Sequence, residues 1–376
     1  SGLVGSEMCI RDSYYLYPAW NRSKTRIAHV GRQAGATHSR QRRDNHLPHR
    51  VTYQDFPMIS SRLLMHKLTL IMSTVLAGAL SAQSPPPITG CAISPNGKNI
   101  LTSSQDGITR YGLATEKQLK TYSISSANLH DLAFSPDGSY LLIVGGRPSE
   151  EWHAAAYHWP SFKLHKAFNG AGDSITTNVW LSDDKFATAD LEGLVKVWSL
   201  SSNKPHLTLN GHSNGITSLV YLKSQDLLVS GGLDNSIRVW DAGQGTLIRS
   251  LNQHTHPVTA IAIAPVQSAL PIIASAGEDR TVRFWQPTIG RMVRYIRLPT
   301  KPLCLTWLTD RHLVAAGRDG IIYVVDSLNV EITNSVRASK SWIYSLAYDG
   351  RTGYVIYTDA NGSLGKQKLS ISELAE

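Results

Sequence analysis

Short apolar runs separated by polar turns occupy the chain from about residue 88 onward. An apolar run at 227–232 is followed by a polar turn at 233–236 and a second apolar run at 237–241. The same succession returns at 273–285, about 45 residues downstream. Turn sequences at 95–98 and 136–139, each with a Pro and a Gly, separate further pairs of apolar runs. Runs this short predict strands rather than helices, so we expect an all-β fold.

Three polar residues recur at fixed intervals inside these units. A Ser or Thr is followed four residues later by a carboxylate, and six residues after that by a Trp. Self-similarity at roughly 40–45 residues, with four short strands a unit, is typical of a propeller blade. A repeated unit cannot bury its apolar face alone, so one good unit implies a ring of them. The three sets are Ser230, Asp234 and Trp240; Ser275, Asp279 and Trp285; and Thr188, Glu192 and Trp198.

These residues, with the preceding Gly211-His212 and Gln253-His254, resemble WD40 repeats. In that family a His, a Ser or Thr, an Asp and a Trp form a hydrogen-bonded tetrad within a blade. Such a network satisfies a buried indole, hydroxyl and carboxylate together. The resemblance implies one tetrad of His212, Ser230, Asp234 and Trp240, a second of His254, Ser275, Asp279 and Trp285, and an incomplete set of Thr188, Glu192 and Trp198, in which Ala171 takes the histidine position.

Weaker copies on both sides complete a seven-bladed β-propeller over residues 83–376. Val325 takes the Trp position in the sixth unit, and the seventh is the most degenerate. Two segments are candidates to close the ring, 369–374 at one end and 68–76 at the other, and the sequence leaves both open. The seven expected units are 88–122, 128–168, 174–209, 212–251, 254–298, 301–336 and 340–374.

Residues 1–64 show neither a helical nor a strand period. They hold ten Lys or Arg and four Asp or Glu, and thus +6 of the formal net charge of +9. The basic character therefore belongs to this leader, which removes most of the support for nucleic acid as a partner. The first 13 residues resemble a translated sequencing-adapter fragment. We expect a disordered or non-native leader, with Met65 as the native start.

Residues 65–82 are typical of a secretory signal peptide. A short basic start, Met65-His66-Lys67, precedes an uncharged apolar run at 68–80, with small residues after it. This run is too short to span a bilayer comfortably, so no stable membrane span is expected. The alternative is that 68–76 is the closing strand. The signal peptide predicts export to the periplasm or medium, as in exported bacterial WD-repeat proteins; the alternative is a cytoplasmic protein.

No pattern in the sequence predicts catalysis, a cofactor or a metal. Gly211-His212-Ser213-Asn214-Gly215 matches the G-x-S-x-G elbow of serine hydrolases, but that elbow needs a following helix, and here a strand is expected. The histidines lack the spacing of a ligand set. Cys91 and Cys304 stand in apolar surroundings and are expected to be buried small hydrophobes.

One face of the predicted ring carries candidate partner contacts. By the resemblance, loops between second and third strands share a face with the loops between blades. Aromatic and Arg side chains are common interface anchors, and loops carry function more often than scaffolds. The second unit has an enlarged loop at 147–153, and Trp342 opens the seventh. The candidate contacts are Arg147, Glu150, Glu151, Trp152 and Trp342.

The sequence thus predicts a monomeric, non-catalytic scaffold that binds a protein or peptide. The alternative is a propeller enzyme, an exported hydrolase or oxidoreductase, with its site across the central channel. Acidic, basic and His side chains converging on that channel would favour the enzyme, whereas an aromatic patch on the loop face would favour the binder. The choice of function rests on family analogy, since a fold does not fix a function.

Overall fold

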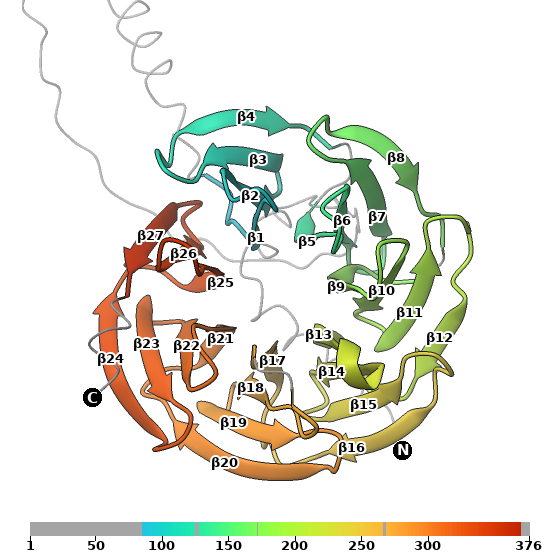
Figure 1. Cartoon of the computed structure of the whole chain (residues 1–376). Helices are drawn as coiled ribbons and strands as arrows, with labels where there is room; N and C mark the ends of the chain where they lie inside the picture. Colours follow the sequence, from blue (N-terminus) through green and yellow to red (C-terminus); the bar gives the residue numbers. More distant parts are fainter. Residues whose placement is uncertain (1–84, 125–127, 171, 266–267, 370–376) are drawn as a thin grey trace, which may run out of the picture. The chain divides into compact units, whose positions relative to one another are not determined.

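Residues 85–124, 128–170, 172–265 and 268–369 are described by the computed structural model. They form seven antiparallel sheets arranged as blades around a central axis (Figure 1). The prediction of an all-β, seven-bladed propeller is confirmed. The predicted leader and signal peptide, 1–82, lie outside the described residues, as do 370–374 of the C-terminal closing candidate.

The strands follow one another from the centre of the ring outward within each blade. Blades one to four comprise β1 (Gly90–Ile93), β2 (Asn99–Ser104), β3 (Gly107–Gly112) and β4 (Gln118–Tyr122); β5 (Leu129–Phe134), β6 (Tyr140–Arg147), β7 (Glu151–His158) and β8 (Lys163–Ala167); β9 (Ile175–Trp180), β10 (Lys185–Asp190), β11 (Leu194–Ser199) and β12 (Leu207–Asn210); and β13 (Ile216–Leu222), β14 (Leu227–Gly232), β15 (Ile237–Asp241) and β16 (Leu247–Leu251).

The remaining blades repeat this order, and blade seven has three strands within the described residues. Blades five to seven comprise β17 (Val258–Ile263), β18 (Ile273–Gly277), β19 (Thr281–Gln286) and β20 (Arg291–Arg297); β21 (Pro302–Trp307), β22 (His312–Gly317), β23 (Ile321–Asp326) and β24 (Glu331–Arg337); and β25 (Ile343–Asp349), β26 (Tyr354–Asp359) and β27 (Leu364–Lys368). One 3-10 turn, Lys223–Gln225, joins β13 to β14.

Two kinds of loop share one edge of every sheet, because neighbouring strands are antiparallel. The first strand of a blade begins where the second ends, so the turn between second and third strands lies beside the loop from the previous blade. We call this side of the ring the inter-blade face.

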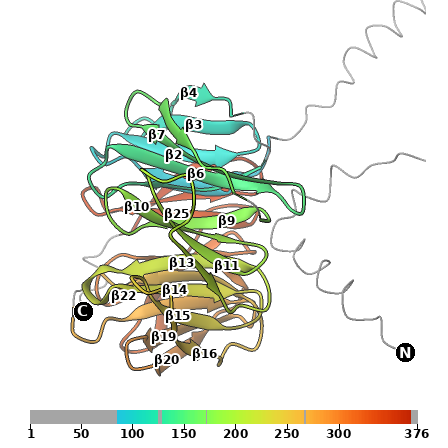
Figure 2. The same cartoon turned by 90° about the vertical axis from the view of Figure 1, so that its right-hand side faces the viewer.

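The hydrophobic core is divided into clusters that neighbouring blades share. Ala187 and Val195 of blade three, for example, pack in one cluster with Leu219 and Trp240 of blade four. Figure 2 shows the ring from its side, with the sheets of successive blades packed against each other. Burial of such faces is the main stabilising contribution, at roughly 25 cal/mol per Å² of apolar surface.

The ring closes between blades seven and one through backbone and side-chain contacts. The amide of Ile88 donates to the carbonyl of Asp359 at 3.2 Å, and the amide of Cys91 donates to Ser345 Oγ at 3.2 Å. Between the same two blades, but on the other face of the ring, the Arg351 guanidinium donates to the carbonyl of Gly97 at 2.9 Å. Blade one is therefore held to blade seven by residues from 88 onward.

Candidate functional site

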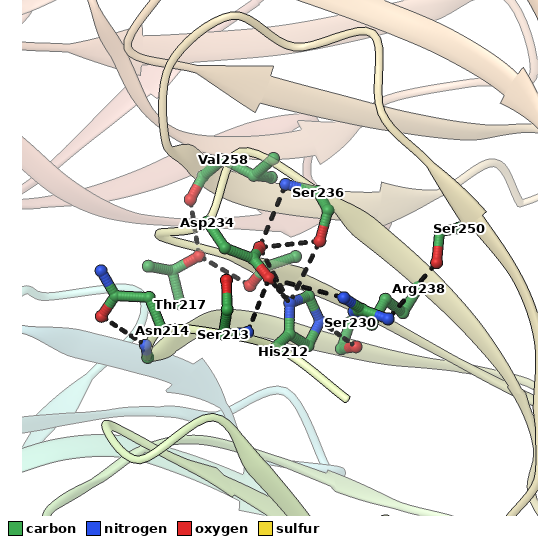
Figure 3. A network of polar contacts seen from close by, with 12 residues as sticks. His212, Ser213, Asn214, Thr217, Ser230, Asp234, Ser236, Arg238, Ser250 and Val258 are labelled. Carbon is green, nitrogen blue, oxygen red and sulfur yellow. Dashed lines mark hydrogen bonds and ion pairs between the residues drawn. The ribbon is translucent and has the colours of Figure 1, made fainter. Parts of the chain in front are cut away.

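The structure brings His212, Ser230, Asp234 and Trp240 together in blade four. The Trp240 indole donates to Ser230 Oγ at 2.9 Å, and Ser230 Oγ lies 2.8 Å from His212 Nε2. His212 Nδ1 lies 3.0 Å from Asp234 Oδ1 (Figure 3). The carboxylate fixes the imidazole proton on Nδ1, so Nε2 accepts the hydroxyl proton of Ser230. Every polar group in this four-residue network has a partner.

Asp234 also anchors the turn between β14 and β15. It accepts the amides of Ser213 at 3.0 Å and Ser236 at 3.1 Å, and Arg238 lies 3.8 Å away. Burial alone would raise the pKa of the Asp234 carboxyl, but hydrogen bonds from His212 and Ser236 bring it well below its ordinary value. The carboxylate is thus a structural anion that ties the inter-blade loop to the turn.

Blade five repeats this geometry with its own residues. Trp285 donates to Ser275 Oγ at 2.8 Å, and His254 lies 2.7 Å from that hydroxyl and 2.8 Å from Asp279 Oδ2. Arg283 takes the position of Arg238, 3.4 Å from Asp279. Blades four and five therefore each contain the same kind of hydrogen-bonded network.

In blade three the indole–hydroxyl pair forms, but the carboxylate differs from the one predicted. Trp198 donates to Thr188 Oγ1 at 3.0 Å. Glu192, the predicted carboxylate, is exposed in the turn. Asp190 takes its role: it is buried, accepts the amide of Leu194 at 2.9 Å, and pairs with Lys196 at 3.1 Å.

The physical reason for this difference is the space that a histidine occupies. Asp190 corresponds to Gly232 of blade four, where an added Cβ would lie 2.7 Å from His212 Nδ1. A side chain at this position is therefore incompatible with the histidine. Blade three has Ala171 in the histidine position, so its sequence can place a carboxylate at residue 190.

A second set of hydrogen bonds, which the sequence analysis missed, joins neighbouring blades around the channel. In each of blades two to seven, a β-bulge near the start of the first strand leaves one residue without a paired residue on the second strand. In blades three to five this bulge residue is a threonine that donates to a backbone carbonyl of the next blade. The bonds are Thr176 to Ile216 (2.6 Å), Thr217 to Val258 (2.6 Å) and Thr259 to Pro302 (2.8 Å).

Other residues extend this set of hydrogen bonds between blades, which forms a belt around the channel. Thr89 donates to the carbonyl of Leu129 at 2.7 Å, and His130 Nδ1 lies 3.0 Å from the carbonyl of Ile175. Burial lowers the pKa of His130 to about 4, so it is neutral at pH 7. The sequence signal for these hydrogen bonds is an apolar residue followed by Thr, which recurs at the start of a unit.

One residue further along, polar side chains accept amides from the next blade. Ser218 Oγ accepts the amide of Ile261 at 2.9 Å, and Ser345 does the same for Cys91. In blade two the acceptor is Asp131, which receives the amide of Asn178 at 3.0 Å. A serine is sufficient for this contact in two blades, so the carboxylate of Asp131 adds a charge that the contact does not require.

A cavity of about 290 Å³ lies in the channel, bounded by the first strands of all seven blades. Hydroxyl-bearing side chains, among them Thr176, Thr217 and Thr259, supply much of its wall. Asp131 is the only Asp or Glu among the described residues that line it, and no Lys or Arg lines it. The cavity is open to solvent and lies where the first strands begin, near the inter-blade face.

Trp342 lies in the loop before β25, on the inter-blade face. It is partly exposed, and the Arg318 guanidinium carbon is 4.6 Å from its ring centroid. Arg318 pairs with Glu278 of blade five, which also binds Lys301 at 2.9 Å. Tyr344, which lines the cavity, packs edge-on against Trp342 at 6.4 Å. This patch, Trp342 with Arg318, joins the inter-blade face to the cavity.

The other predicted contacts lie in a long hairpin rather than in an enlarged loop. β6 and β7 pair as far as Arg147 and Glu151, so the expected loop at 147–153 is mostly strand. Trp152 is half-buried: its indole donates to the carbonyl of Gly170, and its ring stacks on Trp198 at 5.8 Å. Arg147 contacts both Glu150 and Glu151 across the turn, at 3.5 and 3.2 Å. Trp152 thus packs against blade three.

The sequences singled out for other chemistry have local structural roles. Ser213 is exposed between β12 and β13, with a strand rather than a helix after it. Cys91 and Cys304 are free thiols, and burial raises the pKa of Cys91 to about 11. Over the described ranges, no three His, Cys, Asp or Glu side chains are grouped as a metal site. In the same residues we find no helix of the length and apolarity that crossing a membrane requires.

Known proteins with similar sequences carry the same repeat. The family model for the WD domain, G-beta repeat, matches residues 75–111, 203–241 and 245–286. The second match runs from the outermost strand of blade three through β15, and the third from β16 through β19. The second and third matches end with the strands that contribute Trp240 and Trp285, whereas the first ends in β3, which holds no Trp.

Curated relatives resemble only part of this chain. WD repeat-containing protein 55 homolog of Drosophila persimilis is 29% identical over 33% of this chain and 24% of its own length. DDB1- and CUL4-associated factor 10 of Xenopus laevis is 28% identical over 28% and 23%, respectively. GID complex subunit 7 of Schizosaccharomyces pombe is 32% identical over 39% and 30%. The chain therefore spans less than a third of each of these relatives. It carries WD40 repeats on a seven-bladed propeller.

Proposed function

We propose that this propeller is a non-catalytic scaffold that binds a protein or peptide on its inter-blade face. The observation that carries the proposal is the patch of Trp342 and Arg318, partly exposed beside the channel. Trp and Arg are the side chains most enriched among residues that dominate binding energy.

The patch is ordered before any partner arrives. Glu278 holds Arg318 from blade five, and Tyr344 contacts the Trp342 ring from the channel side. Ordering a long side chain on binding costs about 0.5–1.5 kcal/mol, so fixing Arg318 in advance favours association.

The names of two relatives support a protein as the partner. One is named as a factor associated with DDB1 and CUL4, and the other as a subunit of the GID complex. Since less than a third of each is matched, the identity of their partners does not transfer to this chain.

The non-catalytic part of the proposal is supported by what the channel side chains contact. His130, the histidine that lines the cavity, is engaged with a backbone carbonyl of blade three, which leaves Asp131, among the described residues there, as a single carboxylate without a second acid or base. An enzyme needs such groups directed at a substrate atom. We therefore favour the binder over the exported hydrolase or oxidoreductase.

Export is a separate part of the proposal and rests on 65–82, outside the described residues. If these residues are a signal peptide, protein recovered from the periplasm or medium will begin near residue 82 or 83, as N-terminal sequencing would show. Full-length protein confined to the cytoplasm would contradict export and leave the binding proposal untouched.

The binding proposal is tested with Trp342→Ala and a matched control, Tyr295→Ala. Tyr295 also contacts a guanidinium, that of Arg283 at 5.4 Å, but it is exposed on the outer strand β20. We expect Trp342→Ala to lose the partners that wild type retains in chemical crosslinking from native extract, with a melting temperature within a few degrees of wild type. Tyr295→Ala should retain them. The same partners on wild type and Trp342→Ala would remove the patch from the binding site.

A further inference from the structure

The channel cavity contains an uncompensated negative charge. Asp131 faces it, and the groups that contact this carboxylate are neutral: the amides of Leu132 and Asn178 and the hydroxyl of Thr177. Burial raises the pKa of Asp131, and these hydrogen bonds oppose that shift only in part. Burying a carboxylate is unfavourable unless a cation or enough donors compensate it, so this site favours a positively charged ligand.

Three threonines of the wall present hydrogen-bond acceptors to a ligand. A threonine has one hydroxyl proton, and Thr176, Thr217 and Thr259 each donate it to a backbone carbonyl. Their hydroxyl oxygens can therefore offer only lone pairs to a ligand. A wall of this kind suits a group rich in N–H donors.

A buried amide lies next to the cavity. Asn178 lines the cavity, and neither its side-chain oxygen nor its nitrogen has a hydrogen-bond partner among the described residues. Its side chain is in the position that Leu219 and Ile261 occupy in blades four and five, where both are packed in the core. Both amide atoms of Asn178 are closed to solvent, so a ligand in the cavity does not reach them, and the carboxylate of Asp131 is the group that selects the ligand.

We propose that the cavity takes an arginine side chain of the partner, with its guanidinium on the carboxylate of Asp131. Guanidinium carries five N–H donors and a permanent charge, which fit a single carboxylate in an acceptor-rich wall better than the compact ammonium of lysine does. Tyr344 contacts Trp342 and lines the cavity, so the patch of Trp342 and Arg318 lies next to the cavity opening. A peptide bound on the patch can therefore direct a side chain into the cavity. This inference rests on the proposed function.

The structure supplies a matched variant for the test, Asp131→Ser. Ser218 and Ser345 stand at the same position in blades four and seven and accept the same kind of amide, so serine removes the charge and keeps the contact between blades. Asp131→Asn is the second variant, used if Asp131→Ser lowers the melting temperature substantially.

The probes are acetyl-arginine-methylamide, its neutral citrulline counterpart and the lysine counterpart, titrated into the full chain by calorimetry. We expect arginine to bind wild type more tightly than lysine does, and citrulline to bind weakest. Arginine affinity should fall at least about tenfold in Asp131→Ser or Asp131→Asn, since truncating one partner of a buried charge pair is costly. Citrulline affinity should be the same in all three proteins.

Equal binding of arginine and citrulline, no arginine binding to wild type, or unchanged arginine binding in the Asp131 variants would overturn the inference. None of these results affects the Trp342 test. Partner capture that depends on Trp342 but not on Asp131 would leave the proposed function standing and remove arginine from the channel. Loss of both would remove both proposals.

Discussion

Blades four and six differ in a way that separates two parts of the repeat. In blade four Trp240 donates to Ser230, and Asp234 has His212 and Arg238 beside it. In blade six Val325 replaces the Trp and Ala315 replaces the Ser at the matching positions, and both are fully buried.

The carboxylate half of the network nevertheless remains in blade six. Asp319 accepts the amide of Ile321 at 3.1 Å and the hydroxyl of Tyr323 at 2.6 Å, and Tyr323 takes the position of Arg238. Burial, together with this hydrogen bond, raises the pKa of Tyr323 to about 12. The comparison teaches that indole and hydroxyl are lost as a pair, because a buried indole N–H requires an acceptor, while the carboxylate that shapes the turn is independent of them.

The largest expected effect comes from truncating the aromatic half. Trp240→Ala should destabilise the protein by about 3–5 kcal/mol, since it removes a large buried ring and leaves Ser230 and His212 with an incomplete network. Val325→Ala should cost less, about 1.5–2 kcal/mol, at roughly 0.8 kcal/mol for each buried methyl plus a small cavity. Urea unfolding midpoints measure both. Equal shifts would show that the tetrad adds nothing to blade four.

A smaller effect distinguishes the two carboxylates of blade three. Asp190→Ala should cost about 1–3 kcal/mol, because Lys196 and the amide of Leu194 lose a buried partner. Glu192→Ala, at an exposed position, should stay within about 0.5 kcal/mol of wild type. Thermal unfolding of the two variants checks this. If Glu192→Ala is the more damaging of the two, the original tetrad interpretation is right and the assignment to Asp190 fails.

The smallest effect is expected at Ser213. Its side chain is exposed and its amide, which any residue supplies, makes the contact to Asp234. Ser213→Ala should leave stability within about 0.5 kcal/mol of wild type and hydrolytic activity unchanged. An activity-based serine probe that labels wild type but spares Ser213→Ala would overturn the non-catalytic proposal.

The seven-bladed ring could be predicted from the sequence, because a blade is marked by residues that repeat at fixed intervals. The spacing of Ser230, Asp234 and Trp240 is local, and the histidine lies in the loop just before. It was misleading at Glu192, since spacing alone does not show that the absence of a histidine frees space for Asp190.

The channel could not be assembled from spacing because its residues come from seven distant segments. Asp131 contacts Asn178, 47 residues away, and Cys91 contacts Ser345, 254 residues away. Trp152 was misplaced for a related reason. Its hairpin carries no turn signal distinct from a loop, and only the stacking on Trp198 in the next blade shows that it is packed.

The belt of bulge residues has a consequence for how the molecule unfolds. In open repeat arrays each unit contacts only its neighbours, so stability is close to a sum over units and the ends fray. Here each inner strand from blade one to blade five is bonded to the next, and blades seven and one are joined as well. Separating one blade therefore breaks contacts on both of its sides at once. Such coupling makes the propeller a single cooperative unit, in which the inner-strand amides exchange with solvent mainly through global opening.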